Sequence, residues 1–131
     1  NDSCHIILRG GKSGPNYSPE HVADGTGMLE KAGRTPSIMI DCSHCNSIKD
    51  NRNQPKVAAD VASQIRAGNK AITGVMIESH LVEGRQDVVP GKKLVYGQSI
   101  TDACLGWEET KGVLADLADA VRDRRRVGAG A

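Results

Sequence analysis

The chain has 131 residues, a formal net charge of +1 and a hydrophobic fraction of 38%. This nearly neutral balance excludes a global field that would attract nucleic acid or an anionic membrane surface, so neither is expected as a partner. Because no apolar run approaches the roughly 18 residues of a membrane-spanning helix, we expect a cytoplasmic protein.

The first predicted unit is an apolar strand followed by a basic loop and a capped helix. The strand runs from Cys4 to Leu8, and the loop comprises residues 9–12, Arg-Gly-Gly-Lys. Ser18 suits a helix N-cap and Pro19 the first helical position, and together they predict the start of a helix. Gly33 predicts the end of that helix.

Two further units repeat this order of strand, loop and helix. The second has a strand from Ile38 to Asp41 and a helix from about Gln54 to Ala67, with apolar residues at four-residue spacing. The third has a strand from Ile72 to Ile77 and a long loop over residues 79–98. It closes with a helix from about Thr110 to Arg125.

This alternation of strands and helices predicts an α/β fold with parallel strands. The apolar runs are continuous, which is typical of strands that are covered on both faces, as in a barrel. A closed eight-stranded barrel needs about 250 residues, so three units cannot close one. We therefore expect a piece of a larger barrel, with strand edges and an apolar face that favour association.

Three ligand-type side chains follow the predicted strands: His44, Glu78 and Asp102. Barrel active sites form at the carboxyl ends of strands, and one imidazole with two carboxylates suits Mn²⁺, Fe²⁺, Co²⁺ or Zn²⁺. Each residue also has a structural interpretation. His44 suits an interior histidine, Glu78 a hydrogen-bonded pair with His80, and Asp102 a capping box at a short helical turn near Thr101.

Two other patterns are weaker on their own. Arg9 and Lys12 flank a Gly-Gly pair at a strand end, which suits a phosphate or carboxylate but equally an ordinary loop. Cys42 and Cys45 form a C-x-x-C pattern that is found in zinc and redox sites, although no second pair of ligands follows. We expect reduced thiols.

Four segments, taken in order, resemble the carboxyl-terminal portion of the class I 3-deoxy-D-arabino-heptulosonate 7-phosphate (DAHP) synthases. They are HIILRGG at 5–11, MIDCSH at 39–44, GVMIESHLVEG at 74–84 and YGQSITDACLGW at 96–107. They cover the chain almost from end to end. The resemblance implies that residues 1–131 are the last three strand-helix units of a single (β/α)8 TIM barrel catalytic domain.

The resemblance also implies an enzyme of the shikimate pathway to aromatic amino acids. This transferase carries out the metal-dependent, aldol-type condensation of phosphoenolpyruvate with erythrose 4-phosphate to give DAHP and phosphate. His44, Glu78 and Asp102 match three of the family's four metal ligands, whereas the fourth, a cysteine, lies in the absent amino-terminal part. Arg9 matches the arginine that grips the phosphate of phosphoenolpyruvate.

Further expectations follow from the same resemblance. His44 would act in catalysis beside Arg9, by organising water or a proton transfer, and Asp102 would contact substrate. A homo-oligomer is expected. The alternative for the isolated chain is a catalytically inactive half-barrel that acts only as a self-associating structural module. A related phosphoenolpyruvate aldol enzyme with another aldose phosphate as substrate is a third interpretation.

Overall fold

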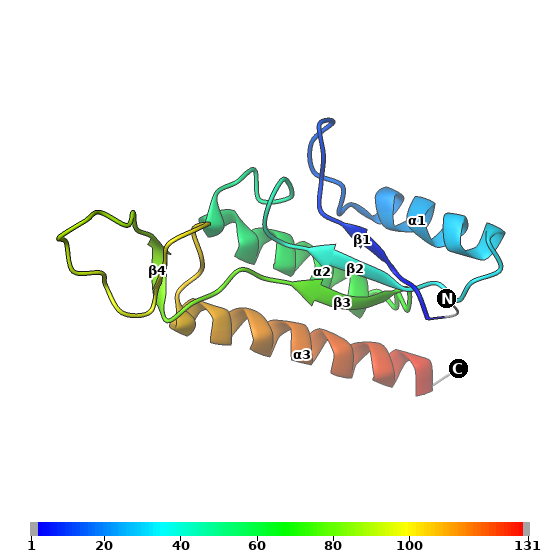
Figure 1. The fold of residues 1–131 in the computed structure, drawn as a ribbon. Coiled ribbons are helices and arrows are strands. Elements are labelled where there is room, and N and C mark those ends of the chain that lie inside the picture. Colours follow the sequence, from blue (N-terminus) through cyan, green and yellow to red (C-terminus); the bar gives the residue numbers. More distant parts are fainter. Residues whose placement is uncertain (1–2, 130–131) are drawn as a thin grey trace.

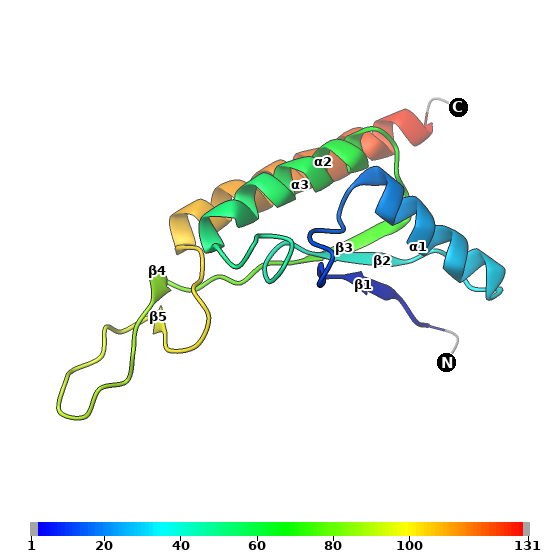
Figure 2. The same ribbon diagram turned by 90° about the horizontal axis from the view of Figure 1, so that it is seen from above.

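The structure is a computed structural model that describes residues 3–129 and has α/β architecture (Figure 1). A parallel three-stranded sheet in the order β1-β2-β3 carries the helices on one side (Figure 2). The strands are β1 (Ile6–Leu8), β2 (Ile38–Asp41) and β3 (Ile72–Met76), and the α-helices are α1 (Pro19–Lys31), α2 (Gln54–Arg66) and α3 (Trp107–Ala129).

The predicted helix signals are confirmed for the first two helices. The side chain of Ser18 caps α1 by accepting a hydrogen bond from the backbone N–H of His21. Gly33 follows the helix with a φ of +67°, a left-handed conformation in which glycine avoids a Cβ clash. The second helix begins at Gln54 as predicted, directly after the short 3-10 helix η1 (Asn51–Asn53).

The third unit differs from the prediction at three places. The loop predicted over 79–98 contains the strand β4 (Val82–Arg85), which pairs in parallel with β5 (Gln98–Ser99) in an arm that projects from the body (Figure 2). The turn near Thr101 is not helical, because its N–H donates to the side chain of Ser99 instead of opening a helix. The last helix begins at Trp107, before its apolar pattern starts, and continues to Ala129.

The core lies between the sheet and the helices. It is formed by side chains that are at most 9% exposed, including Val22, Ile38, Ile40, Val57, Val61, Leu105 and Ala120. The other face of the sheet is open, since Ile7 is 45% and Met76 36% exposed. The bare apolar face expected of three strands without the rest of a barrel is therefore confirmed.

Within residues 3–129, β1 and β3 each leave one edge of the three-stranded sheet unpaired. None of the described helices is both long and apolar enough to cross a membrane.

Candidate metal and anion site

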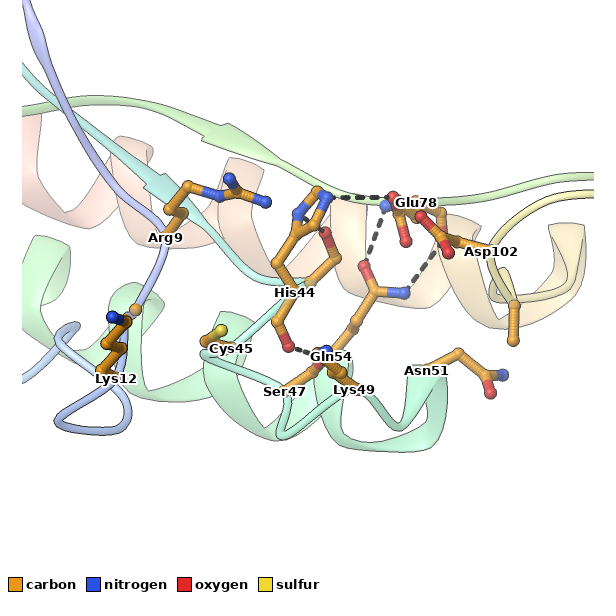
Figure 3. A pocket seen from close by; sticks show the side chains of 14 residues that line it. Arg9, Lys12, His44, Cys45, Ser47, Lys49, Asn51, Gln54, Glu78 and Asp102 are labelled. Atoms are coloured by element: carbon orange, nitrogen blue, oxygen red, sulfur yellow. Dashed lines mark hydrogen bonds and ion pairs between the residues drawn. The ribbon is translucent and has the colours of Figure 1, made fainter.

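An open cleft of about 580 Å³ lies where the three strands end (Figure 3). Arg9 and Lys12 reach it from the loop after β1, His44 from the loop after β2, and Glu78 from the segment after β3. Because parallel strands end at the same edge of a sheet, residues that are far apart in the chain meet here. Asp102, after β5, completes the lining at one end.

Three ligand-type side chains converge in this cleft. One donor atom each from His44, Glu78 and Asp102 lies within 4.8 Å of the others. The Nε2 atom of His44 is 3.6 Å from Oε1 of Glu78. One imidazole and two carboxylate oxygens at this spacing can share a divalent cation after small side-chain rotations.

The imidazole of His44 is held from behind by a buried carboxylate. Asp41, 2% exposed, places Oδ2 at 2.7 Å from Nδ1 of His44. Its Oδ1 accepts hydrogen bonds from the N–H and the hydroxyl of Ser43, at 2.8 and 2.7 Å. When Nδ1 carries the proton toward Asp41, Nε2 presents its lone pair to the cleft, which is the arrangement that a metal-binding histidine needs.

The loop that carries His44 is conformationally unusual. His44, Ile48 and Lys49 have φ values of +47°, +55° and +56°, in the left-handed region that costs free energy for residues with a side chain. Backbone hydrogen bonds hold the loop in this form, among them Lys49 N–H to the carbonyl of His44 at 2.9 Å. Such conformations are concentrated at functional sites, where the surrounding structure enforces them.

The carboxylate of Glu78 lies in a partly buried, negatively charged environment. Burial raises the pKa of Glu78, the charges of Asp102 and Asp41 raise it further, and His44 and Arg9 oppose the change. A divalent cation among these groups would reverse this effect, since it favours the ionised carboxylate. The electrostatics therefore favour a cation at this position.

The two cationic side chains of the loop at residues 9–12 are free to bind an anion. Arg9 and Lys12 are exposed, and neither makes a hydrogen bond or ion pair to another described residue. Their loop is anchored by two asparagines. Gly10 N–H donates to Asn16 at 2.6 Å, Asn16 N–H donates to Asn46 at 2.8 Å, and Asn46 donates to the carbonyls at the ends of β1 and β2.

The other interpretations of these residues are less consistent with the structure. His80 is exposed and accepts a hydrogen bond from the N–H of Leu81, so it does not pair with Glu78. Cys42 points into the core while Cys45 lines the cleft, and both thiols are free. Burial raises the pKa of the Cys42 thiol to about 12, with a further contribution from Asp41. Among the described residues no cysteine joins the three-residue cluster.

Three residues that build the site were not predicted from the sequence: Asp41, Asn46 and Gln54. Asp41 carried a usable signal, since it is an acidic residue at the end of an otherwise apolar strand. Asn46 and Gln54 carried none, because a polar loop residue and a polar residue at a helix start are ordinary. Asn46 and Gln54 act through hydrogen bonds to backbone groups of segments that are distant in the sequence.

Sequence and structure comparisons match this chain to the same family of proteins. The sequence model of the DAHP synthetase I family matches residues 1–115. The chain is 57% identical to a phospho-2-dehydro-3-deoxyheptonate aldolase of Haemophilus influenzae, covering 96% of this chain and 35% of that protein. It is 58% identical to the Phe-sensitive protein of that name from Escherichia coli, covering 95% of this chain and 35% of the relative.

A solved structure agrees with the sequence matches. It is the phospho-2-dehydro-3-deoxyheptonate aldolase of Francisella tularensis, which is 52% identical and superposes with a TM-score of 0.89 over 95% of this chain and 36% of that one. The chain thus spans about a third of the length of the relatives that it matches.

Proposed function

Because this chain belongs to the DAHP synthetase I family, as its sequence motifs predicted, we propose that it supplies the metal-binding side of a DAHP synthase active site. In this proposal residues 1–131 are the last three strand-helix units of a (β/α)8 barrel. The observation that carries the proposal is the convergence of His44, Glu78 and Asp102 at the carboxyl ends of the strands. The reaction is the first step of aromatic amino acid biosynthesis.

The residues fit a divalent cation such as Mn²⁺, Fe²⁺, Co²⁺ or Zn²⁺. Nε2 of His44 and carboxylate oxygens of Glu78 and Asp102 would hold it, and a fourth ligand would come from outside this chain. When bound, the cation supplies Lewis acidity, which polarises a carbonyl group and orients it for attack. Asp41 keeps the imidazole of His44 in the ligating orientation.

The proposed substrates are phosphoenolpyruvate and erythrose 4-phosphate. The guanidinium of Arg9 has the geometry to bind the phosphate of phosphoenolpyruvate through two parallel hydrogen bonds, and it lines the same cleft as the ligand cluster. Arg9 therefore holds one reactant next to the position of the other. Such positioning alone provides a large part of the rate enhancement in a two-substrate reaction.

The reaction balances as one carbon–carbon bond formed, one carbon–oxygen bond formed with water and one carbon–oxygen bond to phosphate broken, with the two protons of the water going to the new hydroxyl group and to the phosphate. The C3 carbon of phosphoenolpyruvate joins the aldehyde carbon of erythrose 4-phosphate, whose oxygen takes up a proton to become a hydroxyl group. Water adds to C2, and phosphate leaves from that carbon. Asp102, at the exposed end of the cluster, would contact the sugar phosphate. Both ring nitrogens of His44 are engaged in this proposal, Nδ1 by Asp41 and Nε2 by the cation, so His44 would not orient the water directly.

A Mn²⁺ titration followed by paramagnetic resonance tests the metal site in this chain. Saturable binding should be lost in His44→Ala and kept in His80→Ala, which removes an exposed imidazole from the neighbouring segment. Equal binding by the parent chain and His44→Ala would contradict the site. Activity is tested by joining the chain to the part of the Francisella tularensis relative that it does not cover, and measuring consumption of phosphoenolpyruvate.

A second candidate function is favoured by the open face of the sheet. Ile7 and Met76 are exposed there, and both outer strands have free edges within the described residues. Two copies could cover these surfaces, giving a self-associating structural module without activity. Light scattering distinguishes the cases, since a defined dimer that dissociates in Ile7→Lys supports the module and a monomer contradicts it.

A further inference from the structure

The side chain of Gln54 forms a two-point contact with the main chain of Glu78. Gln54 is the first residue of α2 and is only 1% exposed. Its Oε1 accepts a hydrogen bond from the N–H of Glu78 at 2.8 Å, and its Nε2 donates to the carbonyl of Glu78 at 3.0 Å (Figure 3). Both polar atoms of the amide are therefore used on one residue of the ligand cluster.

This contact continues the sheet where its strands have stopped. The pairing of β2 with β3 ends with Cys42 N–H donating to the carbonyl of Met76, and Glu78 lies two residues further on. A glutamine amide carries the same donor and acceptor as a peptide group. Gln54 thus takes the place of a strand neighbour on the β2 side, where it accepts from the N–H of Glu78. The carbonyl of Glu78 is also held from the other side, by the N–H of Leu105 at 2.9 Å, so the N–H is the group that depends on Gln54.

The segment that leads into Gln54 also carries His44. His44 and Gln54 belong to the segment that joins β2 to α2, and side chains tie the parts of this segment together. The hydroxyl of Ser47 donates to the carbonyl of His44 at 3.1 Å, and the amide of Asn53 donates to the carbonyl of Ser47 at 3.0 Å. One continuous segment therefore carries the imidazole at its start and the contact to Glu78 at its end.

We propose that Gln54 is a positioning residue that sets the separation between Glu78 and His44, and with it the affinity of the cluster for a divalent cation. This inference rests on the metal site proposed above. Gln54 contacts the peptide group of a ligand residue and none of its ligating atoms, so its effect acts through the position of Glu78. Removing a hydrogen bond that orients a ligand residue, without touching the metal itself, typically lowers metal affinity about 10-fold to 100-fold.

The chain provides a matched control for the loss of a buried amide. Gln64 lies on the same helix, is 8% exposed, and donates to the carbonyl of Tyr17 at 2.7 Å. It does not line the cleft. Replacing Gln54 or Gln64 by methionine removes one buried amide group in each case, but only the first replacement removes hydrogen bonds to Glu78.

The experiment compares the parent chain, Gln54→Met and Gln64→Met by three measurements: Mn²⁺ affinity, hydrogen exchange at the Glu78 amide, and thermal unfolding. We expect Gln54→Met to bind Mn²⁺ about 10-fold more weakly or worse and to exchange the Glu78 amide faster. Gln64→Met should lower the unfolding temperature while keeping both properties. Unchanged affinity in Gln54→Met, or an equal loss in both variants, would overturn the proposal.

Hydrogen exchange at the Glu78 amide tests the positioning role of Gln54 independently of metal binding. If the parent chain binds no Mn²⁺, the proposed metal site fails, and faster Glu78 exchange in Gln54→Met alone still supports the positioning role. Unchanged exchange overturns that role as well. Should Gln54→Met not fold, Gln54→Asn keeps a polar amide but is one methylene too short to make both contacts, and the same outcomes apply.

Discussion

Asp41 Oδ2 lies 2.7 Å from Nδ1 of His44, so the two side chains form a hydrogen-bonded pair in which Nε2 faces Glu78. Asp41 is buried and its other oxygen is occupied by Ser43, so it cannot turn away without losing three hydrogen bonds. The orientation of His44 is therefore set by the protein before any cation binds.

Replacing Asp41 by asparagine should weaken Mn²⁺ binding by about 10-fold to 100-fold. The variant keeps the size of the side chain but removes the charge that holds the proton on Nδ1 of His44. Asp50→Asn is the control, since Asp50 belongs to the same loop but its carboxylate pairs with Arg52 at the surface. Equal Mn²⁺ dissociation constants for Asp41→Asn and the parent chain would contradict the assigned role.

Gly10→Ala should destabilise the fold more than Gly14→Ala. Both glycines have positive φ, at +73° and +103°, so each alanine costs about 1–3 kcal/mol of backbone strain. Only at Gly10 would the new Cβ also meet other atoms, at 2.7 Å from Cβ and 2.9 Å from the carbonyl carbon of Cys45. Urea denaturation measures both variants, and equal midpoints would show that the loops move apart easily.

Arg9→Lys should weaken the binding of phosphoenolpyruvate, because an ammonium group cannot make the bidentate contact of a guanidinium. Loss of one charge-assisted hydrogen bond of about 1.5–3 kcal/mol corresponds to roughly 10-fold or more in affinity. Ligand-observed NMR on the chain measures this. Arg125→Ala, near the carboxyl end of α3 and away from the cleft, should bind as the parent does. Unchanged affinity in Arg9→Lys would contradict the bidentate contact, because lysine keeps the positive charge and loses only the geometry of the guanidinium.

Cys42 and Cys45 should differ in their reaction with iodoacetamide. Cys42 has no accessible surface, whereas Cys45 is partly exposed in the cleft. Mass spectrometry of the native protein should find Cys45 alkylated and Cys42 unmodified, with Cys42 reacting only after denaturation. Comparable rates at Cys42 and Cys45 in the native state would mean that the loop after β2 opens far more often than its hydrogen bonds suggest.

Much of the fold could be predicted because its signals are local. Ser18 and Pro19 start α1 through their own backbone preferences, and Gly33 ends it by adopting a left-handed conformation. The apolar runs identified β1, β2 and β3, since short continuous hydrophobic segments bounded by polar loops favour parallel strands. The β4–β5 arm had no such signal, because its pairing joins exposed segments that are separated by a long loop.

The sequence by itself determined which residues are able to bind a cation or an anion, since His44, Glu78, Asp102 and Arg9 have that chemistry in any conformation. It also determined the family, through the length and order of the motifs. Only the tertiary structure decided that these groups share one cleft and that Asp41 and Gln54 orient them. The physical reason is that hydrogen bonds to distant backbone groups exist only after the strands have paired, so no local pattern encodes them.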